Sequence, residues 1–285
     1  MEWGTVSAAS IIGMAFSLVI SIGFPIALLI IVYRKTHAKI ASCFIGVGAF
    51  VVFALVLEKI LHAIVLLVAG TALQNNIFLY GLYGGLAAAL FEETGRFIAM
   101  KFFMKNSLDK GNALMYGVGH GGAESILIVG FVYVNNIINT IIINTGRAQM
   151  IFSQLDSAIQ GTTYQQLQDF HSVIRESAYQ QLQPLWQSPP YHFYMAGVER
   201  ISAVILQICL SVLAYKCVKT GKLKYIAGAL ALHFIVDFVT VVTAGLGMPM
   251  WAVEIEVIVL VVIIARGVVR IYRKDEVDGE MEMLK

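Results

Sequence analysis

Long runs of apolar residues, separated by short polar breaks, dominate the chain. A helix that crosses a membrane needs about 20 mostly apolar residues in succession. Seven stretches have this length, at residues 7–33, 40–69, 76–104, 112–140, 194–218, 224–245 and 250–272. The pattern predicts an all-α, polytopic membrane protein with about seven transmembrane helices, forming a single integral membrane domain over residues 1–285.

The composition agrees with this prediction. Apolar residues make up 58% of the chain and charged residues 13%, and the mean hydropathy is +0.77. Soluble domains are nearer half apolar and a quarter charged. The three cysteines form no CxxC pair, so they indicate neither a disulfide framework nor a zinc knuckle. The chain has no nucleotide-binding glycine motif and no basic face for nucleic acid, and we expect no nucleic-acid partner.

The basic residues predict how the helices are oriented. Fifteen of the 20 lysines and arginines lie at alternate helix ends, whereas only Arg147 and Arg175 lie at the opposite ends. Cytoplasmic loops are enriched in lysine and arginine. We therefore expect an outside N-terminus, a cytoplasmic C-terminus with a short tail at 273–285, and a multi-pass protein of the plasma membrane.

One large segment, residues 145–193, lies between predicted spans on the outer side. Its apolar residues recur at helical spacing after a capping-box pattern formed by Thr163 and Gln166. These apolar positions are Leu167, Phe170, Ile174, Leu182 and Leu185. We expect an extracytoplasmic loop with an amphipathic helix on the membrane surface, and a lid or substrate-recognition element is the alternative.

Ionisable residues inside the predicted spans indicate a functional site, because a charge in the bilayer is costly unless it is paired or hydrated. Three spans carry them: Glu92, Glu93 and Arg96 on the third, His120 and Glu124 on the fourth, and His233 and Asp237 on the sixth. At 1.5 Å per residue, all three groups lie roughly 12–18 Å from the cytoplasmic boundary. The topology thus predicts that carboxylates and imidazoles meet at one depth.

The spacing of these residues suggests pairs within each helix. Glu92 and Arg96, His120 and Glu124, and His233 and Asp237 are each four residues apart and share a helix face. Arg96 could hold one carboxylate ionised and leave Glu92 or Glu93 as a base, and a carboxylate near a histidine can fix its tautomer. A polar cluster that only specifies helix packing is the alternative.

Two further features concern helix packing. Glu58, Lys59 and His62 on the second span and Glu199 and Arg200 on the fifth are expected to form structural ion pairs between these two helices. The glycines of YGLYGG (80–85) and YGVGHGG (116–122) are expected to let helices approach closely.

A carboxylate base with two imidazoles and a supporting acid meets the requirements of amide hydrolysis. The carboxylate activates water, and the histidines donate to the developing oxyanion or bind a metal that stabilises it. Neither a GxSxG elbow nor an HExxH zinc-protease helix is present.

Three segments, EETGR (92–96), YGVGH (116–120) and HFIVD (233–237), resemble the motifs of the glutamate-dependent intramembrane proteases. That superfamily includes the prenyl-protein (CAAX) endopeptidases and the PrsW-type proteases. The first-motif spacing, the seven-span layout and Glu124 are most similar to the YhfC family of intramembrane metalloproteases. Arg96 lies one residue closer to the glutamates than in the prenyl endopeptidases, which argues against a prenylated substrate.

The resemblance implies an intramembrane endopeptidase that cleaves a peptide or membrane-protein substrate near the cytoplasmic leaflet, within the lipid bilayer. It implies Glu92 as the base that activates water, with Glu93 and Arg96 as its support. His120 and His233 would bind the water and the oxyanion, and Asp237 would orient His233. The residues alone do not decide which of the two glutamates is the base.

A divalent metal such as zinc is left open. Two histidines and a carboxylate with a free position suit catalytic zinc, and the expected ligands of a bound metal are His120, Glu124 and His233. The same groups could also polarise water directly. Two other functions are compatible with the residues: a non-catalytic scaffold or immunity-type relative, and a proton-coupled transporter, although the repeat and broken helices typical of transporters are not evident.

Overall fold

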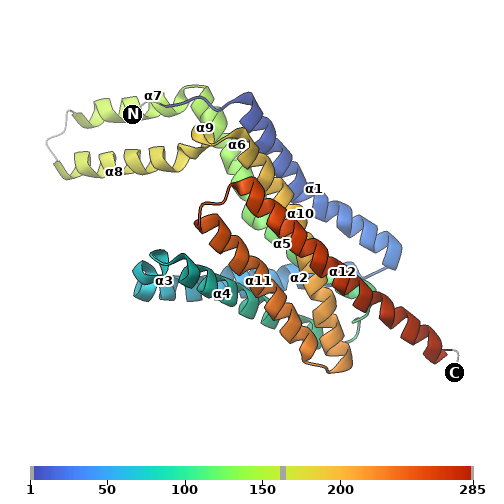
Figure 1. Ribbon diagram of the computed structural model, residues 1–285. Helices are drawn as coiled ribbons and strands as arrows, with labels where there is room; N and C mark the ends of the chain where they lie inside the picture. Colours follow the sequence, from blue (N-terminus) through green and yellow to red (C-terminus); the bar gives the residue numbers. More distant parts are fainter. Residues whose placement is uncertain (1–2, 161–164, 284–285) are drawn as a thin grey trace.

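The computed structural model describes residues 3–160 and 165–283, and every regular element in this part of the chain is helical (Figure 1). Within these residues, five helices are long and apolar enough to cross a membrane. They are α1 (Ala8–Thr36), the continuous helices Ile40–Gln74 and Lys110–Asn144, α10 (Pro190–Thr220) and α11 (Lys224–Gly245). The predicted all-α, polytopic membrane protein is confirmed.

Two of the five helices contain π-helical turns. The first consists of α2 (Ile40–Phe50), η1 (Val51–Glu58) and α3 (Lys59–Gln74), and the second of α5 (Lys110–Glu124), η3 (Ser125–Gly130) and α6 (Phe131–Asn144). Such turns are rare and often lie near functional sites. Both lie beside carboxylates of the bundle, since η1 ends at the buried Glu58 and η3 directly follows the half-buried Glu124.

The remaining two predicted stretches are also helical, as α4 (Ile77–Ile98), continued by η2 (Ala99–Phe103), and α12 (Met250–Met283). Both carry several charged residues, including Glu92, Glu93 and Arg96 on α4 and Glu254, Glu256, Arg266 and Arg270 on α12. Helix α12 also extends through most of the segment where a tail was expected. The seven membrane crossings and the orientation of the chain in the membrane remain predictions.

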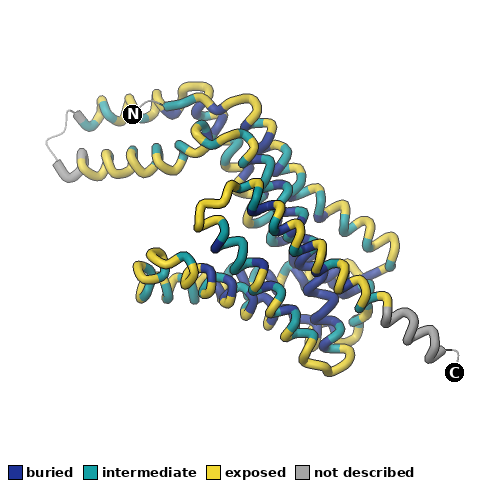
Figure 2. Tube along the Cα trace, viewed as in Figure 1, coloured by how far each residue is buried: buried dark blue, intermediate teal, exposed yellow. Residues whose placement is uncertain are grey.

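Helix α10 lies at the centre of the bundle. It packs against α1, α5, α11 and α12, while α2 packs on α5 and α4 on α11. Figure 2 shows buried residues concentrated where these helices meet and exposed residues on the periphery. The exposed positions include large apolar side chains such as Leu67 and Val68, which suits a surface that faces lipid.

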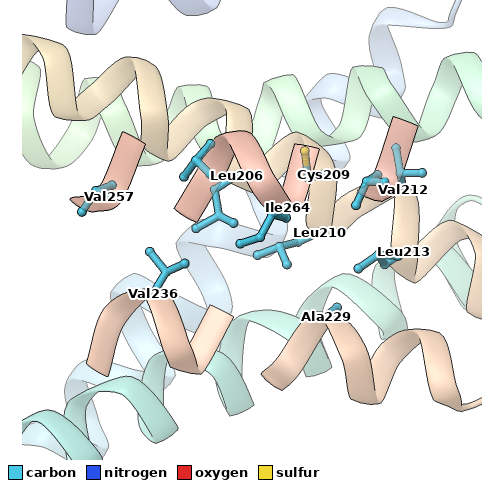
Figure 3. Packing of buried hydrophobic residues seen from close by; sticks show 11 residues of the cluster. Leu206, Cys209, Leu210, Val212, Leu213, Ala229, Val236, Val257 and Ile264 are labelled. Carbon is cyan, nitrogen blue, oxygen red and sulfur yellow. The ribbon is translucent and has the colours of Figure 1, made fainter. Parts of the chain in front are cut away.

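A buried apolar cluster joins α10, α11 and α12 (Figure 3). It includes Leu206, Leu210, Val236, Val257 and Ile264. This cluster fixes α11 beside α10 and so positions the polar residues that both helices carry.

Helix α5 packs closely against α2 and α10 because glycines lie at both contacts. A Cβ atom on Gly119 would lie 2.0 Å from the carbonyl oxygen of Cys43, and one on Gly46 would lie 2.3 Å from that of Tyr116. On the α10 side, a Cβ on Gly121 would lie 2.9 Å from the Cβ of Gln207. The predicted close approach at the YGVGHGG glycines is confirmed, and it brings His120 into the centre of the bundle.

The segment expected on the outer side, residues 145–193, differs from the single amphipathic helix expected. It contains α7 (Arg147–Gln160), α8 (Gln165–Leu182) and α9 (Pro184–Gln187), and Figure 1 shows α7 and α8 projecting from the bundle as a pair. Asp156 on α7 accepts a hydrogen bond from Arg175 on α8 at 2.5 Å. Phe170 and Ile174 are exposed and Leu185 is buried, whereas Thr163 and the side chains of Gln166 and Leu167 lie outside the described residues.

Candidate active site

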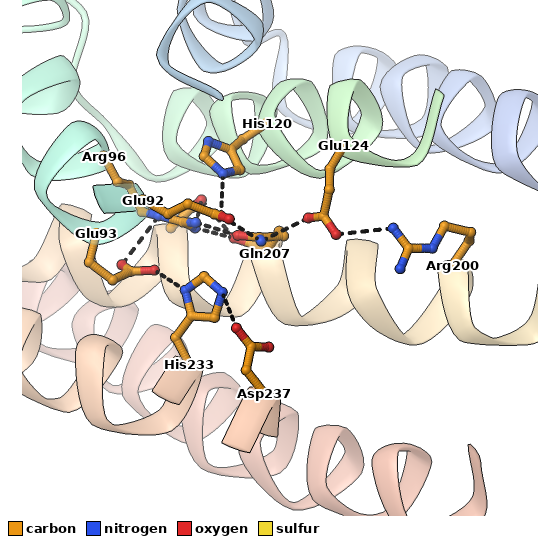
Figure 4. Close-up of polar contacts among 10 residues, drawn as sticks. Glu92, Glu93, Arg96, His120, Glu124, Arg200, Gln207, His233 and Asp237 are labelled. Atoms are coloured by element: carbon orange, nitrogen blue, oxygen red, sulfur yellow. Dashed lines mark hydrogen bonds and ion pairs between the residues drawn. The ribbon is translucent and has the colours of Figure 1, made fainter. Parts of the chain in front are cut away.

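The ionisable residues predicted to share one depth do meet, between α4, α5, α10 and α11 (Figure 4). Five of them are at most 7% exposed: Glu92, Glu93, Arg96, His120 and His233. Ionisable groups this deep in a helix bundle need partners, and each of the five has at least one.

Glu92 pairs with His120. The Nε2 atom of His120 lies 2.9 Å from Oε2 of Glu92, across the α4–α5 interface. Two aromatic rings hold the imidazole in place: Phe50 meets it edge-on at 5.3 Å between centroids, and Tyr116 stacks on it at 6.0 Å. The Nδ1 atom of His120 is buried and has no hydrogen-bond partner among the described residues.

Glu93 links Arg96 to His233. Its Oε2 lies 3.3 Å from Nε of Arg96, and its Oε1 lies 3.0 Å from Nδ1 of His233. On the other side of the ring, Nε2 of His233 lies 3.5 Å from Oδ2 of Asp237. The ion pair of α4 is therefore Glu93–Arg96 at a spacing of three residues, not the Glu92–Arg96 pair that their four-residue spacing suggested.

Gln207 on α10, which was not predicted from the sequence, links the polar residues of α4 with Glu124 on α5. Its side-chain amide donates to Glu92 and to Glu124, each at 2.9 Å. Arg96 in turn donates to the backbone oxygen of Gln207 at 2.6 Å, to its side-chain oxygen, and to Ser211 at 2.8 Å. A sequence signal for Gln207 existed, because Gln207 and Ser211 are polar residues one helical turn apart in an apolar span.

Glu124 does not pair with His120, and that expectation was wrong. It accepts hydrogen bonds from Arg200 at 3.0 Å and from Gln207, because α10 presents a cation and an amide donor to it. The expected ion pairs between the second and fifth spans were also wrong. Arg200 binds Glu124 and Glu199, while Glu58 pairs with His62 of its own helix at 3.0 Å.

Glu92 and His233 line a polar cavity of about 310 Å³, whereas their partners His120 and Glu93 lie behind its wall. Its polar lining includes Glu92, Glu124, Arg200, Gln207, His233 and Asp237, from four different helices. A cavity with a carboxylate, an imidazole and convergent polar groups is the usual form of a binding or catalytic site.

The three expected metal ligands do not converge. Glu124 is turned toward Arg200 and Gln207, and both the Nε2 of His120 and the Nδ1 of His233 face carboxylates. Within residues 3–160 and 165–283, no group of three or more His, Cys, Asp or Glu side chains is arranged to hold a metal. The residue types suit zinc, but their arrangement does not fit a bound ion.

Comparison with known proteins agrees with the motifs. The family model described as "YhfC intramembrane metalloprotease" matches residues 18–259. The chain is 35% identical over 260 residues to "Uncharacterized membrane protein YhfC" of Bacillus subtilis (strain 168), which covers 90% of this chain and 93% of the relative. No solved structure matches. The multi-pass membrane protein described here belongs to the YhfC intramembrane metalloprotease family.

Proposed function

We propose that this protein is an intramembrane endopeptidase in which Glu92, positioned by His120, activates water to hydrolyse a peptide bond. The observation that carries the proposal is the buried 2.9 Å Glu92–His120 pair beside a polar cavity that His233 and Asp237 also line. This brings together a base and oxyanion donors at one place, as acyl hydrolysis requires.

Glu92 has one oxygen available for the base role. Its Oε2 accepts from both His120 and Gln207, whereas no hydrogen bond to Oε1 forms among the described residues. Because Glu92 lines the cavity, Oε1 can take a proton from a water held there. The water oxygen then forms a bond to the carbonyl carbon, and Glu92 returns the proton to the amide nitrogen as the carbon–nitrogen bond breaks.

His233 is the candidate oxyanion donor. Glu93 anchors its Nδ1 at 3.0 Å, while its Nε2 lies 3.5 Å from Asp237, which is longer than a good hydrogen bond. In its imidazolium form His233 donates Nδ1–H to Glu93, and its Nε2–H, which Asp237 holds only weakly, is left to donate to a substrate oxygen as negative charge develops on that oxygen. Arg96 stabilises Glu93 and so maintains the orientation of His233.

The position of the cavity bears on the substrate. It lies inside a helical bundle, at a depth of roughly 12–18 Å from the predicted cytoplasmic boundary. The substrate we propose is a peptide or membrane protein that enters from the cytoplasmic leaflet of the plasma membrane. The mechanism above uses no metal. Metal content of the purified protein, compared with the His120→Ala/His233→Ala double substitution, tests whether these histidines also hold a divalent ion.

The proposal is tested by mapping new N-termini of membrane proteins in cells that express equal amounts of each variant. Wild type should generate N-termini that Glu92→Gln, His120→Ala and His233→Ala all lack. Glu176→Gln, on exposed α8, is the matched control and should behave as wild type. If the three site variants give the wild-type set of N-termini, the protein is not this protease, and a non-catalytic scaffold becomes the better interpretation.

A further inference from the structure

A groove outside the candidate active site runs between α10 and α12. It has a volume of about 630 Å³ and walls that are mostly apolar. From α10 it is lined by Val198, Ile201, Ser202 and Ile205, and from α12 by Ile258, Val261, Val262, Ala265 and Val269, together with Arg266, Arg270 and Arg273. The groove thus combines apolar walls with three guanidinium groups.

The three arginines occupy the half of the groove nearer the C-terminal end of α12. Along α12, the lining positions recur at intervals of three and four residues from Ile258 to Arg273, which is one face of a helix. At 1.5 Å per residue this face is about 22 Å long. One leaflet of a bilayer has about 15 Å of hydrocarbon. The groove therefore matches one acyl chain together with the headgroup region above it.

The arginine end is the cytoplasmic end in the predicted orientation. A guanidinium group binds phosphate oxygens through two parallel hydrogen bonds, and basic pockets between transmembrane helices bind anionic headgroups. Among the side chains that the structure describes, no carboxylate forms an ion pair with Arg266, Arg270 or Arg273. Their charge is complementary to a lipid phosphate.

We infer that this groove binds one anionic phospholipid of the cytoplasmic leaflet, with an acyl chain along α10 and α12 and its phosphate on Arg266, Arg270 and Arg273. Val261 lines both this groove and the polar cavity, so the two lie on opposite sides of the α10–α12 contact. A bound lipid stabilises the contact between α10 and α12, and residues of both helices line the candidate active site.

The test uses native mass spectrometry and thermal unfolding of the purified chain with phosphatidylglycerol or phosphatidylcholine of the same acyl chains. Wild type should bind one phosphatidylglycerol with a preference on the order of tenfold over phosphatidylcholine, and should melt higher with it. The Arg266→Gln/Arg270→Gln/Arg273→Gln variant should lose the preference. The Lys35→Gln/Lys219→Gln/Lys222→Gln variant, with the same loss of charge outside the groove, should keep it.

A fourth variant separates the groove from general charge attraction. Ala265→Trp fills the apolar wall and keeps all three arginines, so it should lose both lipids while eluting as wild type in size exclusion; Val262→Trp replaces it if it does not fold. Equal binding of the two lipids by wild type, or an unchanged preference in the arginine variant, would overturn the inference. So would a dimer that Ala265→Trp dissociates, because the groove would then bind a second copy of the chain.

Discussion

The contact between α2 and α5 gives a prediction that needs no knowledge of the substrate. Alanine at position 119 would place a Cβ atom 2.0 Å from the carbonyl oxygen of Cys43 and 2.7 Å from its carbonyl carbon. Ordinary contact begins near 3.4 Å, so the two backbones must separate by as much as about 1.4 Å at this point. Both atoms belong to the α2 backbone and cannot rotate away.

The expected cost of Gly119→Ala follows from this overlap. Overpacking a buried contact costs typically about 1–3 kcal/mol, and a rigid backbone neighbour favours the upper end, about 3 kcal/mol. For a protein near this size, that lowers the melting temperature by roughly 6–12 °C. The displacement also reaches His120, the next residue, and an error of about 1 Å in a catalytic group can lower the rate by about 100-fold.

Thermal unfolding of the purified protein in one detergent measures the effect, with Gly48→Ala as the matched control. Gly48 lies on α2, as Cys43 does, and a Cβ atom on Gly48 would meet nothing within 4 Å. Alanine in a helix interior is favoured over glycine by roughly 0.5–1 kcal/mol, so the control should melt at or above wild type. If Gly119→Ala melts within about 2 °C of wild type, the close approach of the two helices is wrong.

Three further substitutions test the polar contacts of the site. Gln207→Leu removes the amide that joins Glu92, Glu124 and Arg96, and it should lower the free energy of unfolding by about 1–3 kcal/mol; an unchanged melting temperature would refute that connection. Arg96→Lys keeps the charge, but a lysine cannot reach Glu93, Gln207 and Ser211 together. A denaturation curve should therefore show a free energy of unfolding lower by about 1–3 kcal/mol, and an unchanged value would contradict these guanidinium contacts. Glu124→Gln should leave the rate of proteolysis within about tenfold of wild type, whereas Glu92→Gln should reduce it by roughly 10²–10⁴-fold. If a cleavage assay shows equal losses for the two variants, Glu92 is not distinguished as the base.

The sequence was sufficient to predict the long apolar helices and the meeting of their polar residues. Apolar runs determine which segments are buried or lipid-facing, and distance along a helix determines depth. For that reason Glu92, His120 and His233 could be expected at one level from the order and length of the apolar runs alone. The resemblance to glutamate intramembrane proteases rested on the same three helices.

Partners across helix interfaces could not be predicted in the same way. Spacing within one helix shows which residues share a face, but not what the neighbouring helix presents to that face. Glu124 was therefore assigned to His120, four residues away, although Arg200 and Gln207 of α10 compete for it and bind it. Gln207 was missed because an uncharged amide in an apolar span costs less than a charge and is a weaker signal of a functional site.

The pairing of α7 with α8 also could not be predicted from the sequence pattern. Helix α7 is amphipathic but, averaged over its length, much less apolar than the predicted spans, and so is its partner α8. The Asp156–Arg175 contact that joins the two helices lies between residues 19 positions apart, which no local periodicity reveals.

The central claim is that Glu92 activates water for peptide hydrolysis inside the membrane. The most direct measurement reconstitutes the purified protein in liposomes with one membrane protein identified by the N-terminal mapping, in water enriched in ¹⁸O. Wild type should produce a new carboxyl terminus that carries one ¹⁸O atom, and Glu92→Gln should produce none above background. Cleavage by Glu92→Gln at the wild-type rate, or no cleavage by wild type of any mapped protein, would contradict the account.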